Sequence, residues 1–538
     1  MTTSASSGSA PSPQPAAPGL PAEVVIGLDV GTTAVKVVAF GVGHPWRHTA
    51  IREYPLLAPA PGWQVQDPAT IVAALGNALA DCVAAARGSE VVALSVSSAM
   101  HGLIGLDADL KPLTPLVTWA DSRAHSEAAH LRATGQASAL HRTSGTPVHS
   151  MSPLTKLMWF ARHEPEVCAA ARWWVGLKDY VLLALTGSLV TELSSASSSG
   201  LLDNATRTWS VAALDVAGVR AEQLPPILST TATLDLSATM AARVGLRAGT
   251  PVVVGAGDGP LGNLGTGALE PGVVGLSLGT SGAVRMVVPR PVVDPDGRLF
   301  CYALTDDAWV VGGAVSNGGV VVRWAGDVFG SDLRPGPDGA PRDAELLALA
   351  HAVPPGSDGL VMLPYLLAER APLWDPDLTG AYLGIRHAHT RGHFVRAAVE
   401  GVAFQLSAIV DELDRLEPVT QIRATGGAFR SPVWREVMAA ALAHPLRVTG
   451  GAEGSALGAA ALGLYALGRA TSLADGVALA AGRGPATDVE PPVPVSAFDV
   501  ALYARVRSSI PELLAAYDEV AKLFSSLAVR TADASSPH

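Results

Sequence analysis

Two short segments of the chain share a pattern that suits phosphate binding. Residues 27–36 read GLDVGTTAVK and residues 275–284 read GLSLGTSGAV. Each follows an apolar, β-branched run and contains a Gly-Thr-Thr/Ser turn, which predicts a strand, a tight turn and a returning strand. Backbone N–H groups at such a turn form a concavity that attracts anions. Two such turns, roughly 250 residues apart, predict two related halves that face one polyphosphate.

The residues at the two turns are the first candidates for phosphate contacts. They are Thr32 and Thr33 in the first copy and Gly279, Thr280 and Ser281 in the second. The chain has no G-x-x-x-x-G-K-[ST] segment, so a Walker-type loop is absent. It also lacks a G-x-G-x-x-G segment opening a helix after the first strand, which disfavours a dinucleotide site.

Two charged residues flank the first turn. Asp29 lies in an apolar strand, where a carboxylate is costly without a partner. It is either a hydrogen-bonded strand residue or a ligand of Mg²⁺ or water beside the phosphates, and we favour the second interpretation. Lys36, on the returning strand, suits phosphate neutralisation and a place on the surface equally well.

A further carboxylate, Asp258, stands between two glycines after the short apolar run 252–254. Phosphoryl transfer needs a carboxylate that orients the attacking hydroxyl and accepts its proton. Flanking glycines let a substrate approach closely. The alternative is an ordinary Asp-Gly turn, which the local sequence alone favours.

Another group of residues suits a polyol. His101 follows the predicted buried strand 91–96 and so lies where open α/β sheets bind ligands. Trp119, Asp121 and Arg123 lie close together further along the chain. A tryptophan packs on the apolar face of a sugar, and the other side chains supply hydrogen bonds. Each of these residues, taken alone, is more often structural.

Composition bounds the class of protein. A chain of 538 residues with 49% apolar and 16% charged residues predicts two large α/β domains with real cores. The net charge of −11 argues against nucleic-acid binding. No uninterrupted apolar run reaches the roughly 18 residues of a membrane span, and the N-terminal segment does not resemble a secretory signal. Three scattered cysteines, Cys82, Cys168 and Cys301, predict neither a disulfide framework nor a zinc site, so we expect a cytoplasmic protein.

Local signals place the remaining candidates. Strand 422–425 ends in a glycine pair that includes Gly427, and Ser431 then begins a helix; bare backbone at such a place suits a nucleotide base or ribose. Helices are also expected from Asp67-Pro68 and over 393–413. We expect the chain to divide into an unstructured tail over 1–22, domains over 23–268 and 269–490, a helical extension over 491–525 and a second tail over 526–538, with a surface loop over 331–343.

Two longer segments resemble the signatures of the FGGY family of carbohydrate kinases. Residues 151–163, MSPLTKLMWFARH, resemble the first signature, with Lys156 and Trp159 in place. Residues 380–400, GAYLGIRHAHTRGHFVRAAVE, resemble the second. The resemblance covers roughly residues 23–485. It implies an α/β fold of two ribonuclease-H-like (actin-like ATPase) domains with an active-site cleft between them, which agrees with the repeated turns.

The resemblance also implies roles for individual residues. Asp258 takes the position of the catalytic base and, with Asp29, that of a Mg²⁺ site. Together with the arguments above, the candidate ATP-binding residues are Asp29, Thr32, Thr33, Lys36, Gly279, Thr280, Ser281, Gly313, Asn317, Gly427 and Ser431. The candidate sugar-binding residues are Met100, His101, Trp119, Asp121, Arg123 and Lys156.

Within the family, several segments resemble the branch that phosphorylates gluconate. They are residues 100–123, 144–157, 255–265 and 368–376. The resemblance therefore implies ATP- and Mg²⁺-dependent conversion of D-gluconate to 6-phosphogluconate. Gluconate carries a carboxylate, and Arg123, His149, Lys156 and Arg370 are the candidates to pair with it.

Three alternatives remain. One is a xylulose kinase or another sugar kinase of the family, although the xylulose branch usually has Asn where this chain has Gly259. Another is an actin-like ATPase or assembly protein, which would hydrolyse ATP without a sugar. The third is a sugar sensor without activity, against which Asp258 and both turns argue. The expected partners are a small sugar or sugar acid and a second copy of the chain, with no nucleic acid and no membrane.

Overall fold

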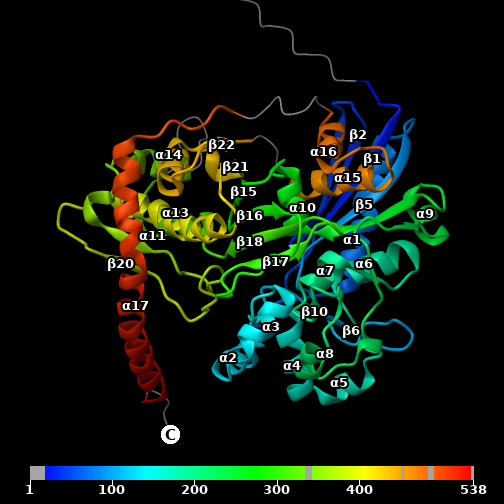
Figure 1. Ribbon diagram of the computed structural model, residues 1–538, viewed down its shortest axis with the longest axis horizontal. Helices are drawn as coiled ribbons and strands as arrows, with labels where there is room; N and C mark the ends of the chain where they lie inside the picture. The colour runs from blue at the N-terminus through cyan, green and yellow to red at the C-terminus, as the bar shows by residue number, and fades with distance from the viewer. Residues whose placement is uncertain (1–18, 334–341, 450–453, 483–489, 535–538) are drawn as a thin grey trace, which may run out of the picture.

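Two six-stranded mixed sheets organise the chain (Figure 1). The computed structural model describes residues 19–333, 342–449, 454–482 and 490–534. The expected tail over 1–22 therefore lies almost wholly outside the described residues, as does most of the surface loop expected over 331–343. In the first sheet the strand order is β3 (Arg47–Glu53), β2 (Ala34–Gly41), β1 (Glu23–Val30), β5 (Glu90–Ser98), β14 (Pro251–Gly257) and β13 (Thr233–Asp235).

The second sheet repeats this arrangement. Its order is β17 (Phe300–Ala303), β18 (Trp309–Val315), β16 (Gly282–Val288), β15 (Val273–Leu278), β21 (Gln421–Thr425) and β22 (Leu446–Val448). In each sheet the first strand forms an antiparallel hairpin with the second, and one further strand, β3 in the first sheet and β18 in the second, extends that hairpin. Two parallel strands lie on the other side of the first strand. The duplication predicted from the two glycine turns, and the two-domain ribonuclease-H-like fold, are confirmed.

Helices cover the outer face of the first sheet. α1 (Pro68–Ala85) begins where the sequence predicts, because the Asp67 carboxylate accepts hydrogen bonds from the N–H groups of Ala69 and Thr70. Its apolar side packs with α6 (Leu177–Thr186) and α9 (Ala238–Val244) on the strands. The large buried core of this half lies between these helices and the sheet.

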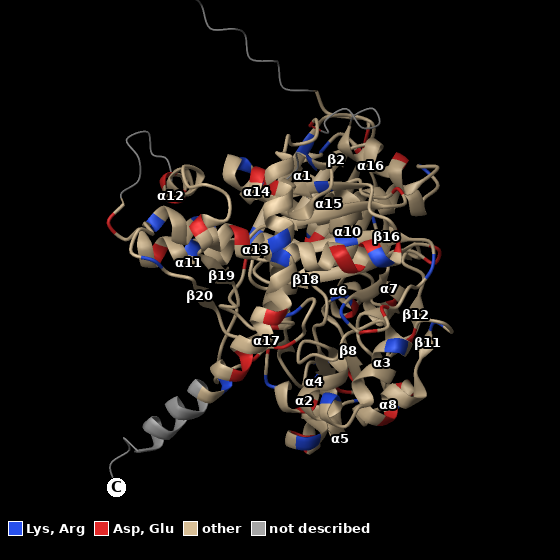
Figure 2. Cartoon of the chain, turned by 60° about the vertical axis from the view of Figure 1, so that its left-hand side comes forward, with Lys and Arg blue, Asp and Glu red and all other residues tan. Residues whose placement is uncertain are grey.

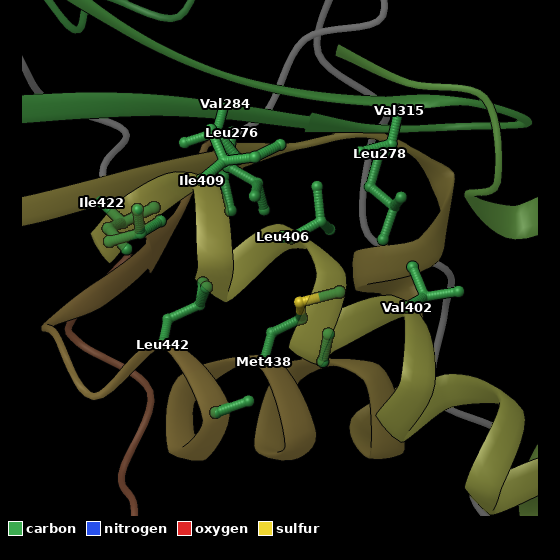
Figure 3. Close-up of a cluster of buried hydrophobic side chains, with 14 of the residues drawn as sticks. Leu276, Leu278, Val284, Val315, Val402, Leu406, Ile409, Ile422, Met438 and Leu442 are labelled. Carbon is green, nitrogen blue, oxygen red and sulfur yellow. The ribbon is translucent and has the colours of Figure 1, made fainter. Parts of the chain in front are cut away.

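A long helix crosses the second sheet. α13 (Arg391–Leu416) contains the predicted helix 393–413, and its Val402, Leu406 and Ile409 pack beneath the strands (Figure 3). Met438 of α14 (Pro432–Leu442) packs against it from the other side. α11 (Gly319–Phe329) and α12 (Arg342–His351) complete this layer.

Two helices late in the chain pack on the first sheet rather than the second. α15 (Gly454–Ala466) lies against β1 and β5 and also against α10 (Asp258–Gly265). α16 (Leu473–Ala481) packs on α15, and both lie beside β1 and β2 in Figure 1. By chain position they belong to the segment 269–490. This segment therefore packs directly on the first sheet, in addition to facing it across the cleft.

Smaller elements form an insertion after β5, around the lower part of the first half in Figure 1. Its helices are α2 (His125–Ala133), α3 (Gln136–Ser144), α4 (Pro153–His163), α5 (Pro165–Ala170), α7 (Leu193–Ser197) and α8 (Val211–Ala217). Short strand pairs join them: β4 (Val65–Gln66) with β7 (Leu116–Val117), β6 (Ile104–Leu106) with β8 (Trp173–Val175), β12 (Ile227–Leu228) with β9 (Thr191–Glu192), and β10 (Leu202–Asp203) with β11 (Thr208–Trp209). A separate core holds this insertion together.

The C-terminal segment is one long helix. α17 (Ala497–Ala534) runs past residue 526, where we expected a tail, because residues 512–534 contain neither proline nor glycine. Tyr503 anchors it: its hydroxyl donates to Glu400 at 2.7 Å, and Arg396 pairs with the same carboxylate at 2.9 Å. Near this helix, β19 (Val361–Leu363) pairs with β20 (Ala381–Leu383).

Charge and hydropathy agree with a folded core. Positive and negative residues are interspersed along the chain in Figure 2. By length and composition alone, α1 and α13 are apolar enough to cross a membrane. In α13, 83% of the apolar window is buried, against 39% in α1, and both helices pack on the sheets described above.

The close contact between β1 and α15 yields a stability test. A Cβ atom at Gly27 would collide with the backbone carbonyl of Ala456. We expect Gly27→Ala to destabilise the fold by about 1–3 kcal/mol, because neither backbone can move freely. Thermal unfolding measures the effect, with Gly19→Ala as the matched control, since nothing lies within 4 Å of a Cβ there. An unchanged melting temperature would contradict this packing.

Candidate active site

Three parallel strands of the first sheet end side by side. β1, β5 and β14 are neighbours whose last residues are aligned. The residues that follow them include Thr32, Met100 and Asp258, so these meet at one edge of the sheet. Ligands of α/β sheets bind outside the carboxyl ends of parallel strands. The topology therefore places the predicted site residues together.

Asp258 is the first residue of α10, directly after β14. Two glycines allow the strand to reach this position: Gly255 has a φ of 74°, and a Cβ there would collide with β5. A Cβ at Gly257 would press against the side chain of Met100. Burial raises the pKa of Asp258, while the nearby Arg285 opposes the shift.

Asp29 and Lys36 form a pair across the β1–β2 hairpin. Burial and the nearby Asp258 carboxylate raise the pKa of Asp29 to about 6, against the opposing effects of Lys36 and a hydrogen bond from the Ser97 hydroxyl at 3.2 Å. Neither Asp29 nor Lys36 lines the cavity described below. The Asp29 carboxylate nevertheless lies close enough to Asp258 for the charge of Asp258 to disfavour its ionised form.

Two side-chain hydrogen bonds to Thr32 hold the first glycine turn in place. Gln66 donates to the carbonyl of Thr32 at 2.6 Å, and the indole N–H of Trp119 donates to the Thr32 hydroxyl at 2.8 Å. The Arg370 guanidinium lies 4.8 Å from the Trp119 ring centroid, on the other side of the cleft. Trp119 thus joins the turn to a residue of the second domain.

The second turn faces open space. A Cβ at Gly279 would touch nothing within 4 Å, and Thr280 and Ser281 are exposed. The carbonyls of Gly279 and Thr280 accept from the N–H groups of Gly319 and Val320 at the start of α11. This turn therefore caps a helix with its carbonyl groups.

The glycine pair after β21 lies beside that turn. β21 is parallel to β15, and Gly426, with a φ of 119°, abuts the backbone of Leu278. Gly427 has open space where a side chain would be. Ser431 is the N-cap residue of α14 but makes no side-chain cap bond. The structure therefore brings Gly427 next to the second turn, with Ser431 at the start of the following helix.

A cavity of about 370 Å³ opens between the two sheets. Of the predicted site residues, the following line it: Thr32, Thr33, Met100, His101, Trp119, Asp258 and Ser281. The second domain adds residues from β16, β17 and the segment after β19, among them Arg285, Tyr302 and Arg370. Both glycine turns and the candidate base therefore open on one space.

His101 is held in an unusual conformation. Its φ is 64°, a value that costs energy in a non-glycine residue. Its Nδ1 lies 3.0 Å from the carbonyl of Ser198, so Nδ1 carries the proton and Nε2 is an acceptor. Burial and the neighbouring Lys156 lower its pKa to about 3. His101 is therefore neutral and suits a substrate hydroxyl.

Lys156 does not reach the cavity. Its ammonium donates to the carbonyls of His101 at 2.6 Å and Thr118 at 2.7 Å. A third, longer bond of 3.4 Å reaches Val117. Lys156 thus ties together the segments that carry His101 and Trp119, and burial lowers its pKa to about 7.

Asp121 and Arg123 also lie outside the cavity. The Asp121 carboxylate accepts two side-chain hydrogen bonds from Arg123, at 2.8 and 2.9 Å, and one from the Gln64 N–H at 2.7 Å. The guanidinium of Arg123 lies 3.7 Å from the Trp63 ring centroid. Both side chains are almost fully buried, so this pair is committed to the insertion core.

Gly313 and Asn317 act on a neighbouring segment instead of facing the cavity. The Asn317 amide accepts from Leu366 and Leu367 and donates to Glu369 at 3.3 Å. A Cβ at Gly313 would press against Ala371. Together they fix the chain on either side of Arg370 over β18.

Sequence reasoning missed two groups near the base. Arg285 was detectable, because a cation inside the apolar strand GAVRMVV needs a reason to be there. The buried pair Lys178–Glu192, at 2.9 Å, had no sequence signal. Glu192 caps α7, and the Ser194 hydroxyl in α7 accepts from Gly257 at 3.1 Å, so the pair supports the residue before Asp258.

Comparison with known proteins places the chain in a family. Residues 24–265 match the N-terminal domain of the FGGY family of carbohydrate kinases, and residues 274–467 match its C-terminal domain. The chain belongs to the FGGY family of carbohydrate kinases, whose members use ATP as the phosphate donor.

Individual relatives agree over most of the chain. The gluconokinase of Bacillus subtilis (strain 168) is 38% identical over 456 residues, 83% of this chain and 88% of that protein. The crystal structure of gluconate kinase from Lactobacillus acidophilus has a TM-score of 0.85 at 32% identity, covering 92% of this chain and 98% of that one. The ligand-bound xylulose kinase of the same organism has a TM-score of 0.87 at 31% identity, with 93% and 100% covered.

The role of Lys156 predicts a pH-dependent stability. Lys156→Met leaves buried carbonyls without a donor, at about 1–3 kcal/mol each, so the melting temperature falls. The pKa of Lys156 is about 7 when folded and 10.5 ordinarily. Between these values the unfolded chain binds more protons, so the stability that Lys156 contributes rises with pH.

We therefore expect the gap in melting temperature between wild type and Lys156→Met to be wider at pH 9 than at pH 7. Lys111→Met, at an exposed lysine, is the matched control. A gap that narrows with pH would contradict the assignment.

Proposed function

We propose that this carbohydrate kinase transfers the γ-phosphoryl group of ATP to the terminal hydroxyl of D-gluconate. The observation that carries the proposal is the position of Asp258. It lines the same cavity as residues of both glycine turns and as polar side chains that suit a sugar, such as His101 and Trp119. The likeness to proteins named gluconokinase and gluconate kinase supports the choice of substrate. Xylulose is the second candidate, because a xylulose kinase structure fits the fold equally well.

In this mechanism the two turns hold the phosphates. Backbone N–H groups and hydroxyls of Thr32, Thr33, Thr280 and Ser281 surround the γ-phosphoryl group, and Lys36 adds positive charge from β2. Gly427 provides bare backbone for the nucleoside, with Ser431 nearby. Such fixed donors stabilise the charge that develops on the moving phosphoryl group.

Asp29 and Asp258 are suited to Mg²⁺. The charge of Asp258 raises the pKa of Asp29, so a cation between the two carboxylates would relieve their repulsion, and Mg²⁺ is usually held by one or two carboxylates with phosphate and water. Among the described residues there is no group of three or more His, Cys, Asp or Glu side chains placed for a metal. When bound, Mg²⁺ would neutralise phosphate charge.

Asp258 acts as the base. Its carboxylate accepts the proton of the attacking hydroxyl as the new O–P bond forms and the bond to ADP breaks. Burial raises its pKa, which strengthens it as a proton acceptor, while Arg285 and Arg370 oppose that shift. The neutral His101 accepts a hydrogen bond from another substrate hydroxyl and orients the chain of the sugar acid.

Substrate identity is tested by an ADP-release assay with gluconate, xylulose, glycerol, ribulose and fuculose. We expect the highest kcat/KM with gluconate, because the cavity carries two guanidinium groups. ATP without any sugar should be hydrolysed slowly. A higher kcat/KM with xylulose would show that xylulose, and not gluconate, is the substrate. ATP hydrolysis without a sugar at the rate of phosphorylation would exclude the kinase mechanism.

Replacing the base tests the mechanism. Asp258→Asn keeps the shape of the side chain but removes the proton acceptor, so we expect kcat to fall by about 10²–10⁴-fold. ATP affinity, measured by calorimetry, should change little. The exposed Asp109→Asn is the matched control. Turnover of Asp258→Asn within a few-fold of wild type would show that another group takes the proton.

A further inference from the structure

Two guanidinium groups line the cavity from the second domain without a carboxylate in ion-pair contact among the described residues. Arg370 is fixed by bonds from Nε to the Ser316 hydroxyl at 3.1 Å and from Nη2 to the carbonyl of Val315 at 2.9 Å. Arg285 is held less tightly. It makes one long bond, 3.4 Å, to the Ser277 hydroxyl.

One N–H group of Arg285 also lacks a hydrogen-bond partner. Its Nε is buried and finds no hydrogen-bond partner in the part of the chain that the structure describes. The Tyr302 hydroxyl, in the same cavity, is likewise buried and unpartnered there. A buried donor without a partner costs free energy, so both groups are arranged for something that enters the cavity.

The cavity has an excess of positive charge. Asp258 is the only carboxylate among its lining residues, against Arg285 and Arg370. Burial lowers the pKa of both arginines, that of Arg370 to about 10. Desolvated cations of this kind are stabilised by an anion, and guanidinium groups match a carboxylate or phosphate geometrically.

The other candidates considered from the sequence are bound elsewhere or neutral, although the neutral His149 also has a buried Nε2 without a partner among the described residues. Arg123 is bound to Asp121, and Lys156 to backbone carbonyls. The Nδ1 of His149 accepts from the N–H of Met151 at 3.2 Å, and burial lowers the pKa of His149 to about 3, so it is neutral.

The position of Arg285 on its strand separates it from the phosphate turn. β16 begins at Gly282, directly after the turn, and side chains two residues apart share a face of a strand. Arg285 therefore emerges about 7 Å further along the strand than Ala283. In the register of the sheet Arg285 is level with Gly312 of β18 and Phe300 of β17, and Tyr302, whose ring stacks on that of Phe300 at 4.4 Å, lies two residues further along β17. The guanidinium of Arg285 lies next to α10, because a Cβ at Gly259 would be 3.4 Å from its Nη2 and 3.5 Å from its Nε.

We propose that Arg285 binds the carboxylate of a sugar-acid substrate, with Arg370 and the Tyr302 hydroxyl beside it. Arg285 is then the residue that selects a sugar acid over a neutral sugar. This inference rests on the proposed function and deepens it. It also assigns the acid end of the substrate to the second domain, while the hydroxyl that reacts lies beside Asp258 of α10.

The test compares D-gluconate with D-gluconamide, in which a neutral amide replaces the carboxylate. Wild type should prefer gluconate by about 10–100-fold in kcat/KM, the range expected for a charge-assisted contact. In Arg285→Met this preference should collapse to less than about threefold, mainly through a higher KM for gluconate. ATP affinity, measured by calorimetry, should stay within about twofold.

The matched control is Arg290→Met. Arg290 is an exposed arginine shortly after β16, and its replacement should leave the preference for gluconate intact. Arg285→Gln serves as the second variant, because it retains donors without the charge. It should lose the same preference, and thermal unfolding verifies that both variants are folded.

Two results would overturn the inference. If Arg285→Met lowers kcat/KM equally for gluconate and gluconamide, or weakens ATP binding, Arg285 serves the base or the phosphate and not the carboxylate. If both variants keep the wild-type preference for gluconate over gluconamide, another group binds the carboxylate. The proposed function fails in a different way, with wild type itself phosphorylating xylulose in preference to gluconate.

Discussion

The parallel pairing of β1, β5 and β14 is the constraint on which the site depends. It ends three strands at one edge, so that the first glycine turn, the loop of Met100 and His101 and the candidate base become neighbours although they are far apart in sequence. The pairing tolerates no side chain at Gly255, which abuts β5, or at Gly257, which abuts Met100. The same order recurs in the second sheet, where it places the second turn beside the Gly426–Gly427 pair.

Packing between the halves fixes how these two edges face each other. α10 begins with Asp258 and packs on α15, a helix that the chain forms only after completing the second sheet. A residue of the second domain also reaches across, since Arg370 lies over the Trp119 ring. Stability and site geometry are therefore coupled, because a change that displaces α15 from β1 also displaces α10, the helix that begins with the candidate base Asp258.

Much of this was predictable from the sequence, for physical reasons. The turns, the caps and the apolar periodicity are local, so the hairpin around Thr32, the start of α1 and the extent of α13 were predicted correctly. Contacts between residues that are distant in the sequence were not predicted, because they form only when the chain folds. Nothing near Asp121 in the sequence shows that its oxygens are taken by Arg123 and Gln64, and the ties of Lys156 are to carbonyls, which every residue has.

The uneven charge of the cavity arises because its acidic and basic side chains come from different domains. Among the described residues, the one carboxylate that lines the cavity, Asp258, comes from the first domain, and the guanidinium groups of Arg285 and Arg370 come from the second. With a neutral polyol bound, Asp258 would be the only carboxylate from the described part of the chain that lines the cavity opposite these two arginines. The carboxylate of a sugar acid would satisfy them, and the neutral His101 opposite adds no charge that would compete for it. The charge distribution thus favours an acidic substrate that bridges the cleft, with its acid held by one domain and its reacting hydroxyl by the other.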